Sequence, residues 1–275
     1  MITKTINLRK EPTENGFMPT LKAYLIEKLD ADRKRPAIVV FPGGGYAYTS
    51  PREAERIALN YNAAGFQAFV LSYSTAPHKH PLPIQDAATA IKTVRENADE
   101  WNINPDWIAI IGFSAGGHLA ASISVHWDNP EIFSADEIAA GLHKPNASIL
   151  SYPVITSGEF AHRGSFENLL GEDADEKMLE MMSLEKQVKE STPPAFLWHT
   201  YTDGAVPVEN TLLYASALSK YKIPCEVHIY PNGVHGLSLV SDETIWSVTK
   251  FRRKYDWLNQ SVEWMIDLFD IKLEE

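Results

Sequence analysis

The chain has 275 residues, of which 44% are hydrophobic and 11% aromatic, and its formal net charge at neutral pH is −11. A chain of this length and composition can bury a large hydrophobic core within one domain. Phosphate contacts need clustered Lys and Arg, so an acidic chain is a poor partner for DNA or RNA and we expect no nucleic-acid partner.

The single cysteine, Cys225, cannot form an intramolecular disulfide, which is typical of a protein from a reducing compartment. Residues 1–9 lack the apolar segment of a secretory signal. No stretch of the chain approaches the roughly 20 apolar residues that span a bilayer. We therefore expect a cytoplasmic protein that has no contact with a membrane.

From about residue 20 onward, short apolar runs alternate with segments of helical periodicity. The pattern predicts, in chain order, strand 21–27, strand 36–41, helix 52–64, strand 67–73, helix 84–94, strand 106–111, helix 114–126, strand 148–152, strand 195–199, helix 208–221, strand 226–230 and helix 244–269. Short apolar strands separated by helices of this length indicate a mostly parallel sheet that is covered on both faces. We expect a single α/β domain over 1–275.

The alternation breaks between about 127 and 194, where the sequence is acidic and mixed. We interpret 127–194 as an insertion over the sheet. Two readings stay open for it: a structural excursion with methionines as filler, or a partial lid near a functional site.

A serine between glycines follows the predicted strand 106–111, in the segment Gly112-Phe-Ser114-Ala-Gly116. The pattern G-x-S-x-G, placed between a strand and a helix, presents a serine hydroxyl on a sharp turn above a sheet. The alternative is an ordinary tight turn. A serine hydroxyl needs a general base and an orienting carboxylate to become nucleophilic, so the hypothesis requires both further along the chain.

Among the nine histidines, His235 is the best candidate for the base, because it follows the last predicted strand in a loop that contains glycines. We set His199 aside because it comes too early in the chain. The acid is expected after the preceding strand, where Asp203 is the only carboxylate between Ser191 and Val208. A turn aspartate is the alternative reading of Asp203, and Glu209 is the fallback acid.

Three consecutive glycines, Gly43 to Gly45, follow the predicted strand 36–41. Such a run is entropically costly, and it suits a loop whose backbone N–H groups approach a ligand. A phosphate-binding loop is the rival reading, but the Lys-Ser/Thr that would follow is missing. We expect one oxyanion donor in the residue after the nucleophile, Ala115, and another in this loop.

Taken together, these segments resemble the α/β-hydrolase superfamily, and more narrowly the hormone-sensitive-lipase-like carboxylesterases and the bacterial acetyl-xylan and feruloyl esterases. The resemblance covers about residues 36–240 and is carried by Phe41-Pro-Gly-Gly-Gly-Tyr46, Ser72-Tyr-Ser-Thr-Ala-Pro77 with Pro81-Leu-Pro83, Gly112-Phe-Ser-Ala-Gly-Gly117, Asp203-Gly-Ala-Val-Pro207 and His235-Gly236. It implies a doubly wound sheet of about eight strands and the roles assigned above to Ser114, Asp203 and His235. It also implies three oxyanion donors, Gly44, Gly45 and Ala115.

One position departs from the lipase-like pattern, where the glycine loop usually begins with His. Here that position is Pro42. The departure favours the branch that resembles acetyl-xylan esterases, and with it a substrate with a small acyl group, acetylated sugars being one candidate. The resemblance implies no cofactor, and the sequence has no metal-ligand spacing such as His-Glu-x-x-His.

Substrate contacts are read from residues near the predicted site. Tyr46 and His118 are candidates for the pocket wall, and His162 and Arg163 are candidates for binding a polar leaving group. Aromatic side chains near the mouth either stack on sugar rings or belong to the core: Tyr46, Tyr48, Phe113 and Trp198.

Two other functions remain open at this point. The Asp203 segment also resembles prolyl-oligopeptidase-type peptidases, although 275 residues leave little room for their large additional domain. A non-catalytic binding protein on a hydrolase scaffold is the third hypothesis, because fold alone does not fix function. A homodimer through a sheet edge or the last helix is compatible with the sequence.

Overall fold

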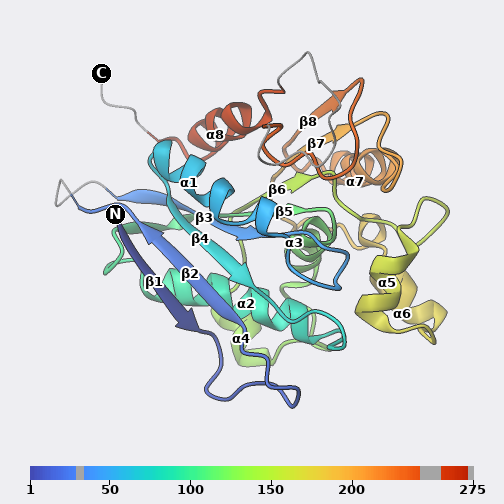
Figure 1. The fold of residues 1–275 in the computed structure, drawn as a ribbon, viewed down its shortest axis with the longest axis horizontal. Helices are drawn as coiled ribbons and strands as arrows, with labels where there is room; N and C mark the ends of the chain where they lie inside the picture. Colours follow the sequence, from blue (N-terminus) through green and yellow to red (C-terminus); the bar gives the residue numbers. More distant parts are fainter. Residues whose placement is uncertain (29–33, 242–254, 272–275) are drawn as a thin grey trace.

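The computed structural model describes residues 1–28, 34–241 and 255–271, and they form one sheet with helices on both faces (Figure 1). The sheet has eight strands in the order β1-β2-β4-β3-β5-β6-β7-β8. Their bounds are β1 Ile2–Asn7, β2 Thr20–Leu25, β3 Arg35–Phe41, β4 Gln67–Ser72, β5 Ile103–Phe113, β6 Ala147–Ser151, β7 Ala195–Thr200 and β8 Cys225–Tyr230. The predicted mostly parallel sheet of about eight strands is confirmed.

Strand direction follows from the connections. β1, β2 and β4 pair antiparallel, whereas β4, β3, β5, β6, β7 and β8 run parallel, with helices in most of the crossovers. The central strands are apolar along most of their length because both faces are covered, as in β6, where every residue is buried. β1 was not predicted, because its alternation of Ile, Thr and Lys suits a half-exposed edge strand rather than a buried one.

Successive side chains of the central strands enter two separate cores. Ile38 and Val40 pack with α1 (Glu55–Ala63) and α8 (Trp257–Leu268). Val39 and Phe41 pack with the other face, which is covered by α2 (Leu82–Glu96), α3 (Ala115–His126) and α7 (Glu209–Lys220). The predicted helix 244–269 corresponds to α8 at 257–268, and 244–254 lie outside the described residues.

The predicted insertion 127–194 is divided by the sheet itself. It contains α4 (Ala135–Ala140) and then β6, which pairs with both β5 and β7 and is therefore a central strand. The longer part outside the strands is the segment 152–194, between β6 and β7. It carries the short elements α5 (Arg163–Leu170), α6 (Glu176–Met181) and η2 (Leu184–Lys186).

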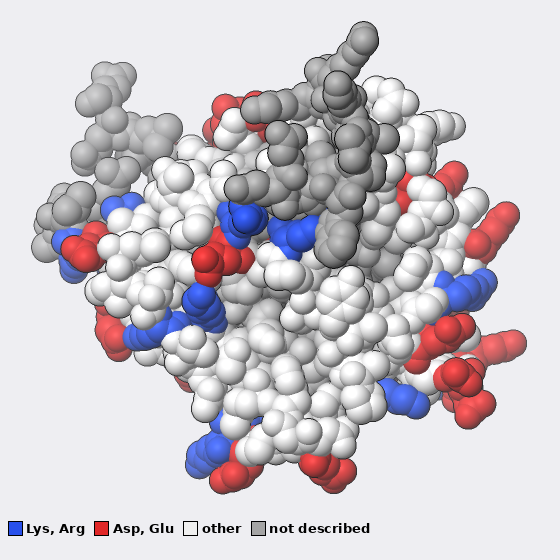
Figure 2. Space-filling model, viewed as in Figure 1, with Lys and Arg blue, Asp and Glu red and all other residues white. Residues whose placement is uncertain are grey.

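Among the short helices in this segment, α6 begins at a side-chain cap, which favours a helix in a polar sequence. The Asp175 carboxylate accepts a hydrogen bond from the Met178 N–H at the start of α6. Figure 1 shows α5 and α6 at the side of the sheet away from β1, and Figure 2 shows acidic side chains gathered over them. The centre of the view in Figure 2, beside these helices, shows mostly uncharged residues.

The turn from β5 into α3 is closely packed around its glycines. A Cβ on Gly112 would lie 2.0 Å from the carbonyl oxygen of Gly116, and one on Gly116 would lie 2.1 Å from that of Phe41. Both contacts are with backbone atoms, which cannot move aside as a flexible side chain can. The strand and the helix therefore approach as closely as they do only because glycine occupies these positions.

We predict that Gly112→Ala lowers the free energy of unfolding by at least about 3 kcal/mol, because the new methyl group overlaps backbone. Urea denaturation followed by fluorescence measures this difference. The matched control is Gly204→Ala, where a Cβ meets no atom within 4 Å, and its stability should stay within about 0.5 kcal/mol of wild type. Equal stability of the two variants would contradict the packing described for this turn.

Candidate active site

Ser114 lies at the turn between β5 and α3, and its backbone has φ 54° and ψ −117°, the left-handed region that non-glycine residues rarely adopt. Neighbouring backbone holds it there. The Ser114 N–H donates to the Ser151 carbonyl at 3.0 Å, and the Ser114 carbonyl accepts from the N–H groups of His118 and Val154. The side chain therefore stands at the N-terminus of α3, where the helix dipole favours negative charge.

His235 lies in the loop after β8 and reaches Ser114 across the sheet, with its Nε2 atom 2.7 Å from the Ser114 Oγ atom. The loop bends at Gly236, which has φ 76°, and the Gly236 carbonyl accepts a hydrogen bond from Arg52 at 2.9 Å. The Tyr152 ring packs edge-on against the imidazole, with centroids 5.2 Å apart. The imidazole is thus held between the serine and an aromatic wall.

Asp203 lies in the turn after β7, and its Oδ2 atom is 2.7 Å from His235 Nδ1. Its Oδ1 atom accepts from the backbone N–H groups of Ala205 and Val206, at 2.9 and 3.0 Å. Burial alone would raise the pKa of this carboxyl, but hydrogen bonds from His199 and His235 outweigh it and hold the pKa well below its ordinary value. Asp203 is therefore a carboxylate throughout the neutral range.

The acceptors around His235 determine where its protons lie. A carboxylate only accepts hydrogen bonds, so His235 donates its Nδ1–H to Asp203. The lone pair of Nε2 then faces the Ser114 hydroxyl, which donates to it. This arrangement can remove a proton from Ser114 as its oxygen attacks an electrophile.

The glycine loop lies directly beside Ser114, because a Cβ on Gly43 would be 3.2 Å from the Ser114 Cβ atom. The Gly43 N–H donates to Glu53 at 3.0 Å. For the N–H groups of Gly44, Gly45 and Ala115, the part of the chain that the structure describes provides no acceptor. Gly44 and Gly45 have φ 126° and 64°, backbone conformations that residues with a Cβ rarely adopt.

Sequence reasoning missed Glu53, which is 3% exposed. It connects the glycine loop to the loop after β8 that contains His235, called the histidine loop below. One carboxylate oxygen accepts from Gly43, and the other accepts from the Tyr152 hydroxyl at 2.6 Å. Tyr152 in turn accepts from the Ser238 N–H at 2.9 Å. A lone glutamate in a polar turn gives no sequence signal, because its partners come from distant parts of the chain.

Tyr46 and His118 are both 1% exposed, so the structure does not present their side chains to a pocket. The Tyr46 hydroxyl is 2.9 Å from His118 Nδ1, and His118 Nε2 is 3.0 Å from the Met182 carbonyl. Burial lowers the pKa of His118 to about 4, so the ring is neutral and can bridge a donor and an acceptor. Through this pair, the residue that follows the glycine loop is joined to Met182 in the segment 152–194.

Arg163 is the first residue of α5, and His162 directly precedes it. The Arg163 guanidinium donates to the Ser157 and Gly158 carbonyls, each at 2.9 Å, so it closes its own loop. His162 is half-buried, and its Nδ1 atom is 2.9 Å from Ser165 Oγ. Burial first, and then repulsion from His235 when that ring is protonated, lowers the pKa of His162.

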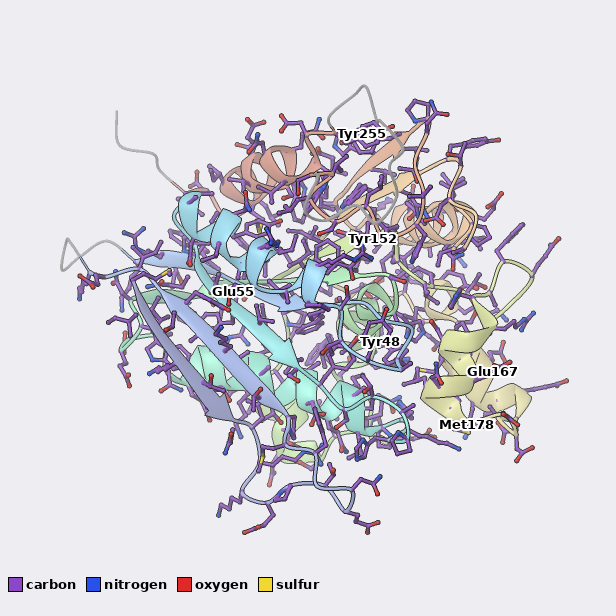
Figure 3. All side chains as sticks on the ribbon, in the orientation of Figure 1. Tyr48, Glu55, Tyr152, Glu167, Met178 and Tyr255 are labelled. Carbon is purple, nitrogen blue, oxygen red and sulfur yellow. The ribbon has the colours of Figure 1, made fainter. Side chains whose placement is uncertain are left out.

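The glycine loop and α5 are joined directly, because Asn168 donates to the Gly45 carbonyl at 2.9 Å. Of the aromatic residues proposed for the mouth, Phe113 and Trp198 are buried in the core, whereas Tyr48 is 61% exposed. A Cβ added to Gly44 would lie 3.3 Å from a ring carbon of Tyr48, and Figure 3 shows the Tyr48 side chain between the sheet and Glu167 of α5. One exposed ring therefore stands next to the loop with the unpaired N–H groups.

Within 1–28, 34–241 and 255–271, no group of three or more His, Cys, Asp or Glu side chains is arranged to hold a metal ion. Over the same ranges, none of the helices has the length and apolar character to cross a membrane.

Comparison with known proteins identifies related chains. Residues 23–218 match the model of the BD-FAE family. The chain is 42% identical over 232 residues to endo-1,4-beta-xylanase B of Butyrivibrio fibrisolvens and 36% identical over 221 residues to an acetylxylan esterase of Xylanibacter ruminicola. These alignments cover 83% and 78% of this chain but only 36% and 44% of the relatives, so the chain spans less than half the length of either.

A solved structure covers the whole chain more evenly. The crystal structure of an acetyl ester-xyloside bifunctional hydrolase from Caldicellulosiruptor lactoaceticus superposes with a TM-score of 0.86 at 39% identity. The match includes 98% of this chain and 97% of that one.

We predict that Tyr152→Phe lowers the free energy of unfolding by about 1–3 kcal/mol, because Glu53 and the Ser238 N–H each lose a buried partner. Chemical denaturation measures the loss. The control is Tyr214→Phe, because the Tyr214 hydroxyl is buried without a hydrogen-bond partner among the described residues. Removing that hydroxyl should leave stability unchanged or raise it, and equal losses in both variants would count against the Glu53 network.

Proposed function

The chain belongs to the BD-FAE family of α/β-hydrolases, and on this premise we propose that it is a carboxylic ester hydrolase with Ser114, His235 and Asp203 as its catalytic triad. The observation that carries the proposal is the continuous line of hydrogen bonds, 2.7 Å from Ser114 Oγ to His235 Nε2 and 2.7 Å from His235 Nδ1 to Asp203 Oδ2. A serine, a base and an orienting carboxylate in this order activate the serine for acyl transfer.

In the first half of the reaction, Ser114 Oγ attacks the ester carbonyl carbon while its proton passes to His235 Nε2. The carbonyl oxygen becomes an oxyanion, and the N–H groups of Gly44, Gly45 and Ala115 are proposed to stabilise it. When the tetrahedral intermediate collapses, the bond to the alcohol oxygen breaks and His235 gives its proton to that oxygen. An alcohol leaves, and the acyl group remains as an ester of Ser114.

In the second half, water replaces the alcohol. His235 takes a proton from the water as its oxygen attacks the acyl carbon, and a second oxyanion occupies the same donors. The Ser114 oxygen then leaves with the proton from His235. The products are the free serine and a carboxylic acid, so no cofactor is consumed at any step.

For the substrate, we propose esters with a small acyl group, including acetyl groups carried on sugars. Two features support this class. A xylanase and an acetylxylan esterase are among the relatives at 42% and 36% identity. The exposed Tyr48 ring beside the glycine loop offers an apolar face on which a sugar ring can stack.

We further propose that the segment 152–194 forms one wall of the substrate cleft, in place of the wider insertion 127–194. Asn168 and the Tyr46–His118 pair attach this segment to the glycine loop. His162 on this wall is neutral because burial lowers its pKa, so it can exchange hydrogen bonds with a sugar hydroxyl without adding charge.

We predict that Ser114→Ala lowers kcat/KM on p-nitrophenyl acetate by on the order of 10⁴-fold or more, and that Asp203→Asn causes a loss of similar order. Initial rates measured on purified protein test this. Ser219→Ala, an exposed serine on α7, is the control and should keep wild-type activity.

An organophosphate probe should label wild type and Ser219→Ala but not Ser114→Ala. Ester turnover by Ser114→Ala equal to wild type would refute the triad. A folded wild-type protein that neither turns over esters nor takes up the probe would favour a non-catalytic binding protein.

We predict that His162→Ala raises KM for an acetylated xylo-oligosaccharide about 10-fold, the value of one hydrogen bond of about 1.4 kcal/mol, while kcat/KM on p-nitrophenyl acetate changes less than about twofold. Steady-state kinetics on both substrates separates the two effects. His228→Ala, which alters a histidine of β8 bonded to Glu226, is the matched control. An equal loss of kcat/KM on both substrates would show that His162 does not bind the alcohol part of the ester.

A further inference from the structure

A second histidine approaches the proposed triad from within the core. His199 belongs to β7 and is fully buried, and its Nε2 atom lies 3.4 Å from Asp203 Oδ2. The same nitrogen is 3.0 Å from the Val206 carbonyl oxygen. On the other side of the ring, Nδ1 is 2.8 Å from the Thr211 hydroxyl of α7. Nothing in its chain position suggests a role, because it precedes the acid and cannot be the base.

The partners of His199 determine its protonation. The Val206 carbonyl and the Asp203 carboxylate only accept hydrogen bonds, so His199 carries a proton on Nε2 and shares it between them. Thr211 has a hydroxyl hydrogen that can be donated to Nδ1. A neutral imidazole with its proton on Nε2 therefore satisfies all three neighbours.

We propose that His199 is a positioning residue of the triad, which acts through Asp203. Its Nε2–H holds the same carboxylate oxygen that receives the His235 Nδ1–H. The inference rests on the triad of the proposed function, because only there does the orientation of Asp203 matter for the reaction.

The carboxylate of Asp203 is satisfied on both oxygens. Oδ1 accepts from two backbone N–H groups, whereas Oδ2 accepts from His235 and lies 3.4 Å from His199 Nε2. Each donor withdraws part of the negative charge and restricts rotation of the carboxylate. Without His199, more of the negative charge of Asp203 would face His235, and the protonated imidazole would be stabilised. The orientation of the imidazole would be less well defined as well.

The test compares His199→Leu, which removes the donor at similar volume, with His199→Gln, whose amide N–H₂ can reach the place of Nε2. For each variant, kcat and KM on p-nitrophenyl acetate are measured from pH 5 to 9 and divided by the concentration of sites that an organophosphate titrates. His143→Leu removes another buried histidine, bonded to the Trp127 carbonyl, and controls for the loss of such a residue.

We expect His199→Leu to lower kcat per titrated site about 10-fold with KM within about twofold, and to move the acidic limb of kcat/KM up by about 0.5 pH unit. His199→Gln should restore the limb and most of kcat, and His143→Leu should change neither. If His199→Leu keeps the wild-type limb and kcat per site while only its melting temperature falls, the proposal is overturned.

A measurement on wild type covers the case in which His199→Leu does not fold. A ¹⁵N–¹H correlation spectrum should show His199 protonated at Nε2 from pH 5 to 9. A proton on Nδ1 alone would leave nothing to donate to Asp203 and would overturn the inference. Neither result depends on the Ser114→Ala assay, whose failure would instead remove the triad itself.

Discussion

The left-handed backbone of Ser114 is the constraint around which the centre of the molecule is built. A residue with a Cβ avoids this conformation, so the surrounding contacts must hold it in place. Gly112 and Gly116 allow β5 and α3 to approach closely enough, and the Ser151 carbonyl fixes the Ser114 N–H from the adjacent strand. The result is a hydroxyl raised above the carboxyl end of a parallel sheet, where loops from other strands can reach it.

Two loops meet the serine there, and a buried network makes them one structure. One carboxylate oxygen of Glu53 accepts a hydrogen bond from the glycine loop, and the other accepts one from the Tyr152 hydroxyl. The Tyr152 oxygen in turn accepts a hydrogen bond from the Ser238 N–H of the histidine loop. Because each of these groups is buried, a shift in one loop would leave a polar atom without its partner. The relative position of His235 and the glycine loop is thus set before any substrate enters, which is the condition for electrostatic preorganisation.

Local pattern and chain order were sufficient for much of this arrangement. The apolar runs located the strands from β2 to β8, and the order of Ser114, Asp203 and His235 led to side chains that the structure places within hydrogen-bonding distance. Contacts between distant segments were not accessible in the same way. Glu53 is bonded to Tyr152 from a distant part of the chain, and β1 lacked the apolar run of a buried strand. His199 has its partners close by in the chain, but its position in sequence does not show that its ring faces Asp203. Tyr46 and His118 were proposed for the pocket wall because they lie close in sequence to the glycine loop and the serine. Proximity in sequence does not determine the direction in which a side chain points.

The carboxylate of Glu53 also bears on the end of the reaction cycle. Ester hydrolysis turns a neutral substrate into an acid that ionises at neutral pH, so the product acquires a charge that the substrate did not have. Under the proposed function, that product anion would form next to Ser114, in a site that also contains Asp203 and the buried Glu53, within a chain whose net charge is −11. Like charges at short range repel strongly. The same buried glutamate that holds the glycine loop would then favour the departure of the product acid from the cleft.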